Sequence, residues 1–446
     1  MNKKVIFLLF AGVLMGAIDI AIIGPALPAI HAAFNISDRD LPWLFNIYVL
    51  FNLVSTPIMG KLSDIYGRRL IYILDLSLFA LGSLVVIASN SFTVLLIGRA
   101  IQGFGAGGIF PVAAAVIGDV IPKEKQGSAL GWIGAVFGLA FIVGPAIGGL
   151  LLLIGWHWIF VINLPAAALL IIFSYRILPH THRKESMRFD YAGMFLLVAL
   201  LASFAYGINR IDTGNFMSSI SNPGVYGFLL FTLVAVFVFY RIEKKSADPA
   251  INLSLLSSRQ LLFTYFIAFG AGIGELSSVY IPSLAIDAFH VSKSTASFML
   301  MPLVGMLFIS APVAGRLIDR TGARPVIMMG ITGMLAGLLV FALLSMTKFN
   351  FYLAQGCLGF GLAFLLGAPL RYIMNHETTE STRAAGQSLL TVFTSTGQLM
   401  SAALIGALIA SFGGGIAGYK NGFLALSVMS IVLLIISFGL KNTSNK

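Results

Sequence analysis

The chain has 446 residues, of which 58% are hydrophobic and only 10% are charged, and its formal net charge is +11. Soluble globular proteins carry about 25% charged residues, so this composition excludes a soluble enzyme or binding domain of such length. The mean hydropathy of +0.95 indicates an integral membrane protein instead.

Apolar segments that are long enough to cross a bilayer recur along the whole chain. The sequence therefore predicts an all-α integral membrane protein. We predict fourteen transmembrane helices, at residues 5–30, 42–60, 70–89, 92–118, 128–154, 157–176, 190–208, 224–241, 260–285, 294–314, 325–346, 350–372, 384–411 and 421–440.

The basic residues predict the orientation of these helices. If the N-terminus lies inside, most of the 28 Lys and Arg residues fall in inner loops and tails, as the positive-inside rule requires. We therefore expect a multi-pass protein of the cell membrane with both termini in the cytoplasm. The positive charge then belongs to a face beside the lipid bilayer, and we expect no nucleic-acid partner.

Cofactor and metal signals are weak. The single cysteine, Cys357, excludes an internal disulfide and a cysteine metal cluster, and the histidines show no ligand spacing. Gly103, Gly105 and Gly108 match a dinucleotide fingerprint, but they lie in a predicted membrane helix, where glycines favour close helix packing. The chain has no G-x-x-x-x-G-K-[ST] motif. We expect no cofactor and no metal.

The sequence is an imperfect duplicate. "GAIDIAIIGPALPAI" resembles the later "GIGELSSVYIPSLAI", which aligns Asp19 with Glu275, and "GKLSDIYGRR" recurs as "GRLIDRTGAR", which aligns Asp64 with Asp319. Both pairs have nearly the same offset, which exceeds half the chain. We predict an N-terminal six-helix bundle, two inserted helices with linkers, and a C-terminal six-helix bundle, at 1–178, 179–259 and 260–446.

Four motifs resemble those of the major facilitator superfamily, and in particular its fourteen-helix drug:proton antiporters. They are "IDIAIIGPALP", "GKLSDIYGRR", "LIGRAIQGFGAGG" and "GPAIGG", in that order along the chain. The first departs from the family at Ala21 and Gly24, where Thr and Asn are usual. The resemblance implies the major facilitator fold, with two six-helix bundles and two inserted helices, and a substrate site at the midplane between the bundles.

The function implied is export of an amphipathic or lipophilic small molecule in exchange for protons, by a monomer that is not an enzyme. The predicted helix over 384–411 has no acidic residue, which favours neutral or monovalent cationic substrates over divalent cations. Two alternatives stay open: an exporter of one specific metabolite or lipid, and a membrane-embedded receptor or enzyme.

Three charges in predicted membrane helices are candidates for proton coupling: Asp19, Glu275 and Arg99. An intramembrane charge costs about 2.5–3.5 kcal/mol on insertion scales, so it normally faces a cavity or a partner. Burial favours the neutral form of a carboxyl group, so the two acids can carry protons, and the arginine can control their release. The alternative is a structural hydrogen bond for each.

Two further charges in predicted membrane helices, Asp75 and Arg371, say less about the function of the protein. Asp75 is expected to pair with Arg69 near the inner end of its helix. Arg371 either lines an inner vestibule or extends to the membrane surface, and both alternatives stay open.

A gating device is predicted in the loop motif. Gly60 and Gly67 permit tight helix ends, and the resemblance implies that Asp64, Arg68 and Asp119 form a set that locks the outward-open state. The second copy keeps Gly315 and Asp319 but has Asn375 where the first has Asp119, so the two locks should be unequal. The alternative is a solvated turn.

A bendable segment is predicted at Gly144, Pro145, Gly148 and Gly149, with plain helix packing as its alternative.

The predicted substrate wall is polar and aromatic, with methionine as an adaptable surface. Its members are Asn46, Tyr48, Asn52, Gln102, Tyr280, Met301 and Gln398.

Overall fold

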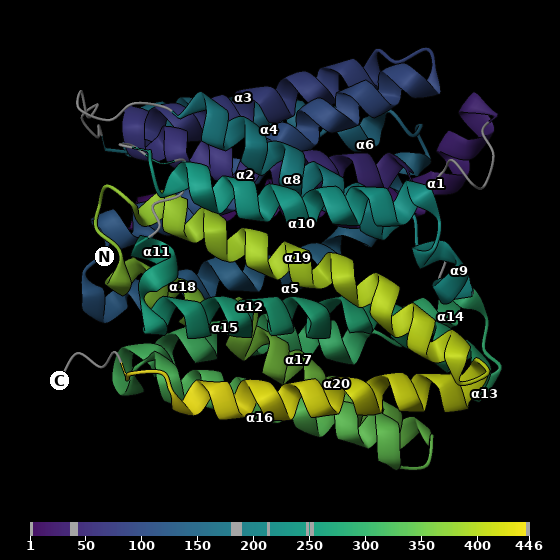
Figure 1. The fold of residues 1–446 in the computed structure, drawn as a ribbon. Helices are drawn as coiled ribbons and strands as arrows, with labels where there is room; N and C mark the ends of the chain where they lie inside the picture. Colours follow the sequence, from purple (N-terminus) through teal and green to yellow (C-terminus); the bar gives the residue numbers. More distant parts are fainter. Residues whose placement is uncertain are drawn as a thin grey trace.

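The structure is a computed structural model that describes residues 3–35, 43–179, 190–211, 215–246, 249 and 254–442. Within these ranges every regular element is a helix, as the sequence predicts. The helices run roughly parallel or antiparallel to one another, and both ends of the chain lie at the same end of the bundle (Figure 1).

The first half of the chain forms one group of helices. Its members are α1 (Lys3–Phe34), α2 (Trp43–Tyr66), α3 (Arg68–Ile87), α4 (Phe92–Val120), α5 (Lys123–Leu152), α6 (Trp158–Val161) and α7 (Asn163–Ile177). Here α4 packs against α2 and α3, and α1 packs against α5.

The second half repeats this arrangement. Its members are α12 (Arg259–Ser277), the 3-10 turn Ser278–Tyr280, α13 (Ile281–Phe289), α14 (Lys293–Phe298), α15 (Met301–Thr321), α16 (Ala323–Leu343), α17 (Lys348–Leu366), α18 (Pro369–Glu377), α19 (Arg383–Ser411) and α20 (Gly415–Phe438). Here α17 packs against α15 and α16, and α12 packs against α19.

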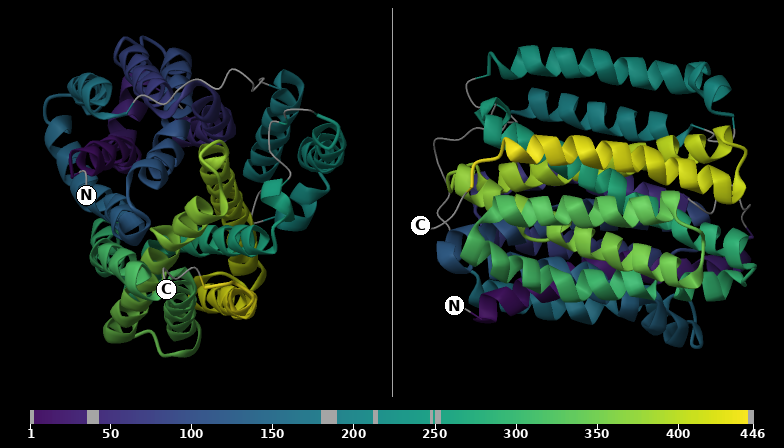
Figure 2. Two further views of the ribbon diagram at one scale, coloured as in Figure 1. Left: turned by 90° about the vertical axis from the view of Figure 1, so that its left-hand side faces the viewer. Right: turned by 90° about the horizontal axis from the view of Figure 1, so that it is seen from below.

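The described part of the segment between the two halves has four helices: α8 (Tyr191–Asn209), α9 (Phe216–Ile220), α10 (Pro223–Glu243) and α11 (Ser254–Ser257). The long pair, α8 and α10, pack on each other, and α8 also contacts α2 and α19. Figure 2 shows this teal pair beside the main bundle, next to the boundary between the halves.

Thirteen helices in the described ranges are long and apolar enough to cross a membrane. The segment predicted at 128–154 overlaps α5, which ends at Leu152 and is not among the thirteen. The predicted number of fourteen is therefore not confirmed.

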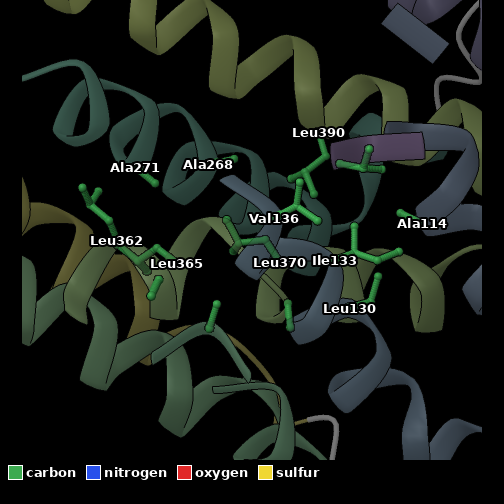
Figure 3. Packing of buried hydrophobic residues seen from close by; sticks show 14 of the residues in the cluster. Ala114, Leu130, Ile133, Val136, Ala268, Ala271, Leu362, Leu365, Leu370 and Leu390 are labelled. Carbon is green, nitrogen blue, oxygen red and sulfur yellow. The ribbon is translucent and has the colours of Figure 1, made fainter. Parts of the chain in front are cut away.

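The two halves meet along two pairs of helices, α5 with α15 and α2 with α19. Apolar side chains from both halves form one continuous core there (Figure 3). It includes Leu130, Ile133 and Val136 from α5, and Leu370 and Leu390 from α18 and α19. Close packing of this kind holds the halves in one relative position.

Gly67 separates α2 from α3, and Gly322 separates α15 from α16. Their φ angles are 97° and 83°, in the region that glycine adopts most easily. The two loop motifs therefore turn in the same way, and the predicted tight helix end at Gly67 is present.

Candidate functional site

A buried ion pair joins α1 and α4. Arg99 Nη1 donates to Asp19 Oδ2 at 2.6 Å, and the other carboxylate oxygen accepts from Gln102 Nε2 at 3.0 Å and Asn163 Nδ2 at 2.8 Å. The Gln102 amide also donates to Ser83 at 2.8 Å. Both oxygens of Asp19 thus accept hydrogen bonds from α4, and Oδ1 also accepts one from α7.

This cluster is closed to solvent. Asp19 is 1% exposed and Arg99 is fully buried. The guanidinium carbon lies 4.3 Å from the centre of the Tyr48 ring, and Nε donates to the carbonyl of Leu44 at 3.2 Å. Because removing either charge leaves the other buried and uncompensated, protonation of Asp19 would strongly change the forces on Arg99.

The equivalent acid in the second half has a different environment. Glu275 on α12 accepts a 2.8 Å hydrogen bond from Gln398 on α19 and is only partly buried. Gln355 stands in the repeat where the first half has Arg99, and its amide has no hydrogen-bond partner within the described residues. The two acids are therefore not interchangeable.

The predicted substrate residues fall into two groups. Tyr48 and Gln102 are buried and contact Arg99, so in this conformation they belong to the charged cluster. The others are partly buried or exposed: Asn46 and Asn52 on α2, Tyr280, Met301 and Gln398. A groove of about 420 Å³ between α15, α16 and α17 is lined by other residues, including Met306 and Cys357.

A second charged cluster lies at the end of the bundle where the termini lie. Arg68 forms an ion pair with Asp64, and its Nε donates to Asp119 Oδ2 at 2.9 Å. These three residues form the Asp–Arg–Asp set expected from the motif.

The same cluster crosses to the second half, which sequence reasoning missed. Arg383 forms an ion pair with Asp119, and Arg68 Nη2 donates to the carbonyl of Glu380 at 2.7 Å. Asp64 accepts hydrogen bonds from the backbone nitrogens of Ala384 and Ala385, at 3.1 and 2.8 Å, in the first turn of α19. A carboxylate there satisfies free N–H groups and favours the helix dipole. We call the side chains of Asp64, Arg68, Asp119 and Arg383, together with the backbone groups that they bind, the first latch.

The repeat produces a counterpart, the second latch. Asp319 on α15 accepts hydrogen bonds from the backbone nitrogens of Gly127 and Ser128, both at 2.9 Å, and from the Ser128 hydroxyl. These residues lie in the first two turns of α5. Ala323 stands where the first half has Arg68, and Asn375 donates to the carbonyl of Ala114 at 3.1 Å. The two latches are thus unequal in charge.

The predicted gating glycines differ in their surroundings. A Cβ at Gly60 would overlap Ser388, and one at Gly315 would overlap the carbonyl of Gly127, so both permit contact between the halves. A Cβ at Gly144 would lie 2.7 Å from Ala21 of α1. A Cβ at Gly149 would meet no atom of the described chain within 4 Å, so Gly149 is not needed for packing.

The predicted bendable segment lies in the interior of α5, which continues as one helix through Pro145. Gly148 is buried in that helix, and the Pro145 side chain lies outside what the structure describes.

The predicted pair between Asp75 and Arg69 is wrong. Asp75 is fully buried, and neither of its oxygens has a hydrogen-bond partner among the described residues. Arg69 instead lies over the ring of Tyr175, at 4.1 Å. The reason is geometric: six residues rotate a helix position by about 240° from its starting direction, so the two side chains leave α3 on different faces.

Comparison with known proteins agrees with this architecture. The family model of the Major Facilitator Superfamily matches residues 9–376 and 261–446. The chain belongs to this superfamily. As a major facilitator it is a multi-pass membrane transporter.

Individual relatives include transporters of the same superfamily. The chain is 38% identical over 398 residues to the "Uncharacterized MFS-type transporter YfiU" of Bacillus subtilis, covering 87% of this chain and 77% of that protein. It is 29% identical to "Multidrug resistance protein 3" of the same organism, over 81% of this chain and 71% of that protein. The crystal structure of the human organic anion transporter MFSD10 matches with a TM-score of 0.74 and 17% identity, over 98% of this chain and 99% of that one.

Proposed function

We propose that this major facilitator is a proton-coupled antiporter that exports amphipathic or lipophilic small molecules by alternating access. The observation that carries the proposal is the buried Asp19–Arg99 pair, with both carboxylate oxygens hydrogen-bonded. Relatives named as multidrug proteins support the substrate class.

Asp19 is the proposed principal proton site. In the charged state it neutralises Arg99, and the amides of Gln102 and Asn163 hold it in place. When Asp19 takes a proton, Arg99 loses its counter-charge and the hydrogen bonds to the carboxylate weaken. Tyr48 and Gln102, which contact Arg99, then change position, and this links protonation to the substrate wall on α2 and α4.

Glu275 is the proposed second site. Among the residues that the structure describes, Glu275 has an amide partner and no arginine partner, so its protonation frees no buried cation. We propose that it senses the substrate, because it shares Gln398 with the substrate wall.

The two latches are the proposed inner gate. Both join the N-terminal turns of a helix in one half to a carboxylate of the other half. Both latches lie at the end of the bundle where the termini lie. We propose that this is the cytoplasmic end. Breaking these contacts would let the halves rock apart on that side, as alternating access requires.

The proposed domain division is 1–178, 179–259 and 260–446. We propose that the protein lies in the cell membrane with cytoplasmic termini. It acts as a monomer in contact with lipid, protons and a small amphipathic substrate. It has no catalytic role.

The test is substrate-dependent proton movement in proteoliposomes that contain the purified protein and an internal pH dye. Addition of ethidium should move protons in the opposite direction to the dye. A proton flux that does not respond to any member of a panel of lipophilic cations and neutral dyes would contradict antiport.

A further inference from the structure

Arg371 on α18 is a buried cation that the proposed proton pathway and the latches do not use. It is 6% exposed, so it does not extend to the membrane surface. Its Nη1 donates to Gln387 Oε1 at 3.0 Å and its Nη2 to Thr391 Oγ1 at 3.2 Å, both on α19. The guanidinium carbon lies 3.6 Å from the centre of the Phe110 ring on α4.

All of these contacts are uncharged. No carboxylate of the described chain lies within ion-pair distance of Arg371, and its Nε has no hydrogen-bond partner there. Asp119 is held by Arg68 and Arg383. Glu275 is bound to Gln398, which lies seven residues, about 10 Å, farther along α19 than Thr391. Buried cations in membrane proteins normally have an anionic partner or face a pathway, so an anion from outside the chain can supply the partner that Arg371 lacks among the described residues.

The position of Arg371 allows an external anion to reach it in one conformation. Phe110 belongs to the first half and packs against Phe137 of α5, with ring centres 5.3 Å apart. Arg371, Gln387 and Thr391 belong to the second half. When the halves separate at the latch end, Phe110 leaves with the first half and uncovers the guanidinium. The cation is thus covered in this conformation and becomes accessible when the proposed inner gate opens.

We propose that Arg371 binds the carboxylate of an organic anion and so extends the exported substrates to amphipathic carboxylates; this rests on the proposed export function. The unpartnered Nε and the adjacent Nη2, held only by a threonine hydroxyl, form one edge of the guanidinium. Such an edge accepts a carboxylate through two parallel hydrogen bonds. The apolar part of the substrate lies against the surface that Phe110 vacates.

The test compares two dyes in inverted vesicles: carboxyfluorescein, an amphipathic carboxylate, and ethidium, a cation. We expect the wild type to accumulate both, and benzoate to compete with carboxyfluorescein but not with ethidium. Arg371→Gln should raise the half-saturating concentration of carboxyfluorescein at least tenfold and change that of ethidium less than twofold. Arg371→Lys should give an intermediate shift, because the charge remains and the paired donors are lost.

A matched control removes a different positive charge. Arg241 lies at the exposed end of α10, and Arg241→Gln should change neither dye. Accumulation of ethidium without carboxyfluorescein by the wild type would overturn the inference and leave the export function standing. Equal shifts for the two dyes in Arg371→Gln would assign Arg371 a structural role and also overturn it. If the wild type accumulates neither dye, both the inference and the proposed export function fail. The benzoate competition tests the carboxylate class of substrate without any variant. Arg371→Lys keeps the buried charge, so it tests the assignment to Arg371 even if Arg371→Gln does not fold.

Discussion

The carboxylate of Asp64 in the first half accepts a 2.8 Å hydrogen bond from the backbone nitrogen of Ala385 in the second half. Its repeat counterpart, Asp319, accepts a bond of similar length from the backbone nitrogen of Ser128 in the first half. Each half therefore holds the first turns of a helix in the other. Among the described residues only the first latch adds the arginines Arg68 and Arg383. The duplication has therefore produced one latch with ion pairs and one in which a carboxylate is held by neutral donors.

The difference between the latches predicts unequal effects on transport. Asp64→Asn removes the ion pair with Arg68 as well as weakening the bonds to α19, whereas Asp319→Asn weakens only its bonds to α5. We expect Asp64→Asn to slow ethidium efflux at least tenfold and Asp319→Asn to slow it severalfold, with ethidium affinity in detergent nearly unchanged in both. Equal losses in the two variants would count against an asymmetric gate.

A stability prediction compares Asp19 and Asp75, two buried acids of the first half. Asp19→Asn leaves Arg99 buried without a counter-charge, which typically costs about 3–5 kcal/mol. Asp75→Asn removes an acid that has no hydrogen-bond partner within the described residues, so it should be neutral or stabilising. Thermal unfolding in detergent should show a lower midpoint for Asp19→Asn only. A similar fall for Asp75→Asn would mean that Asp75 makes a stabilising interaction.

The glycines offer a matched pair of variants. Gly67 has a φ of 97°, so Gly67→Ala should destabilise the protein by about 1–3 kcal/mol. Gly149→Ala should have almost no effect, because nothing in the described chain lies within 4 Å of the added Cβ. The comparison uses apparent melting temperatures under one heating rate. If both variants melt like the wild type, the turn at Gly67 does not require glycine.

How far the sequence predicts this arrangement depends on the range of each contact. The repeat identifies Asp19, Glu275, Asp64 and Asp319 because a duplicated chain keeps equivalent positions visible. It does not identify Asn163 or Arg383, since contacts between helices that are distant in sequence leave no local pattern. Asn163 lies in the first turn of α7, where a polar residue before an apolar run is the only available signal.

The orientation is testable without transport. In a variant without Cys357, a cysteine at Lys245 should react with a membrane-impermeant maleimide only after cells are opened. A cysteine at Lys348 should react in intact cells, because its predicted loop faces outward; both residues are exposed in the structure. Labelling of Lys245→Cys from outside would reverse the proposed topology.

Ethidium uptake into inverted vesicles, with and without an imposed pH gradient, shows whether Asp19 carries the coupled proton. Asp19→Asn keeps the size of the side chain and one acceptor oxygen but removes its change of charge. We expect that the pH gradient no longer drives uptake in Asp19→Asn while passive exchange of ethidium survives, and that Glu275→Gln loses only part of the coupling. If the pH gradient drives uptake in Asp19→Asn as it does in the wild type, Asp19 is not the proton carrier and the Asp19–Arg99 pair is a structural feature.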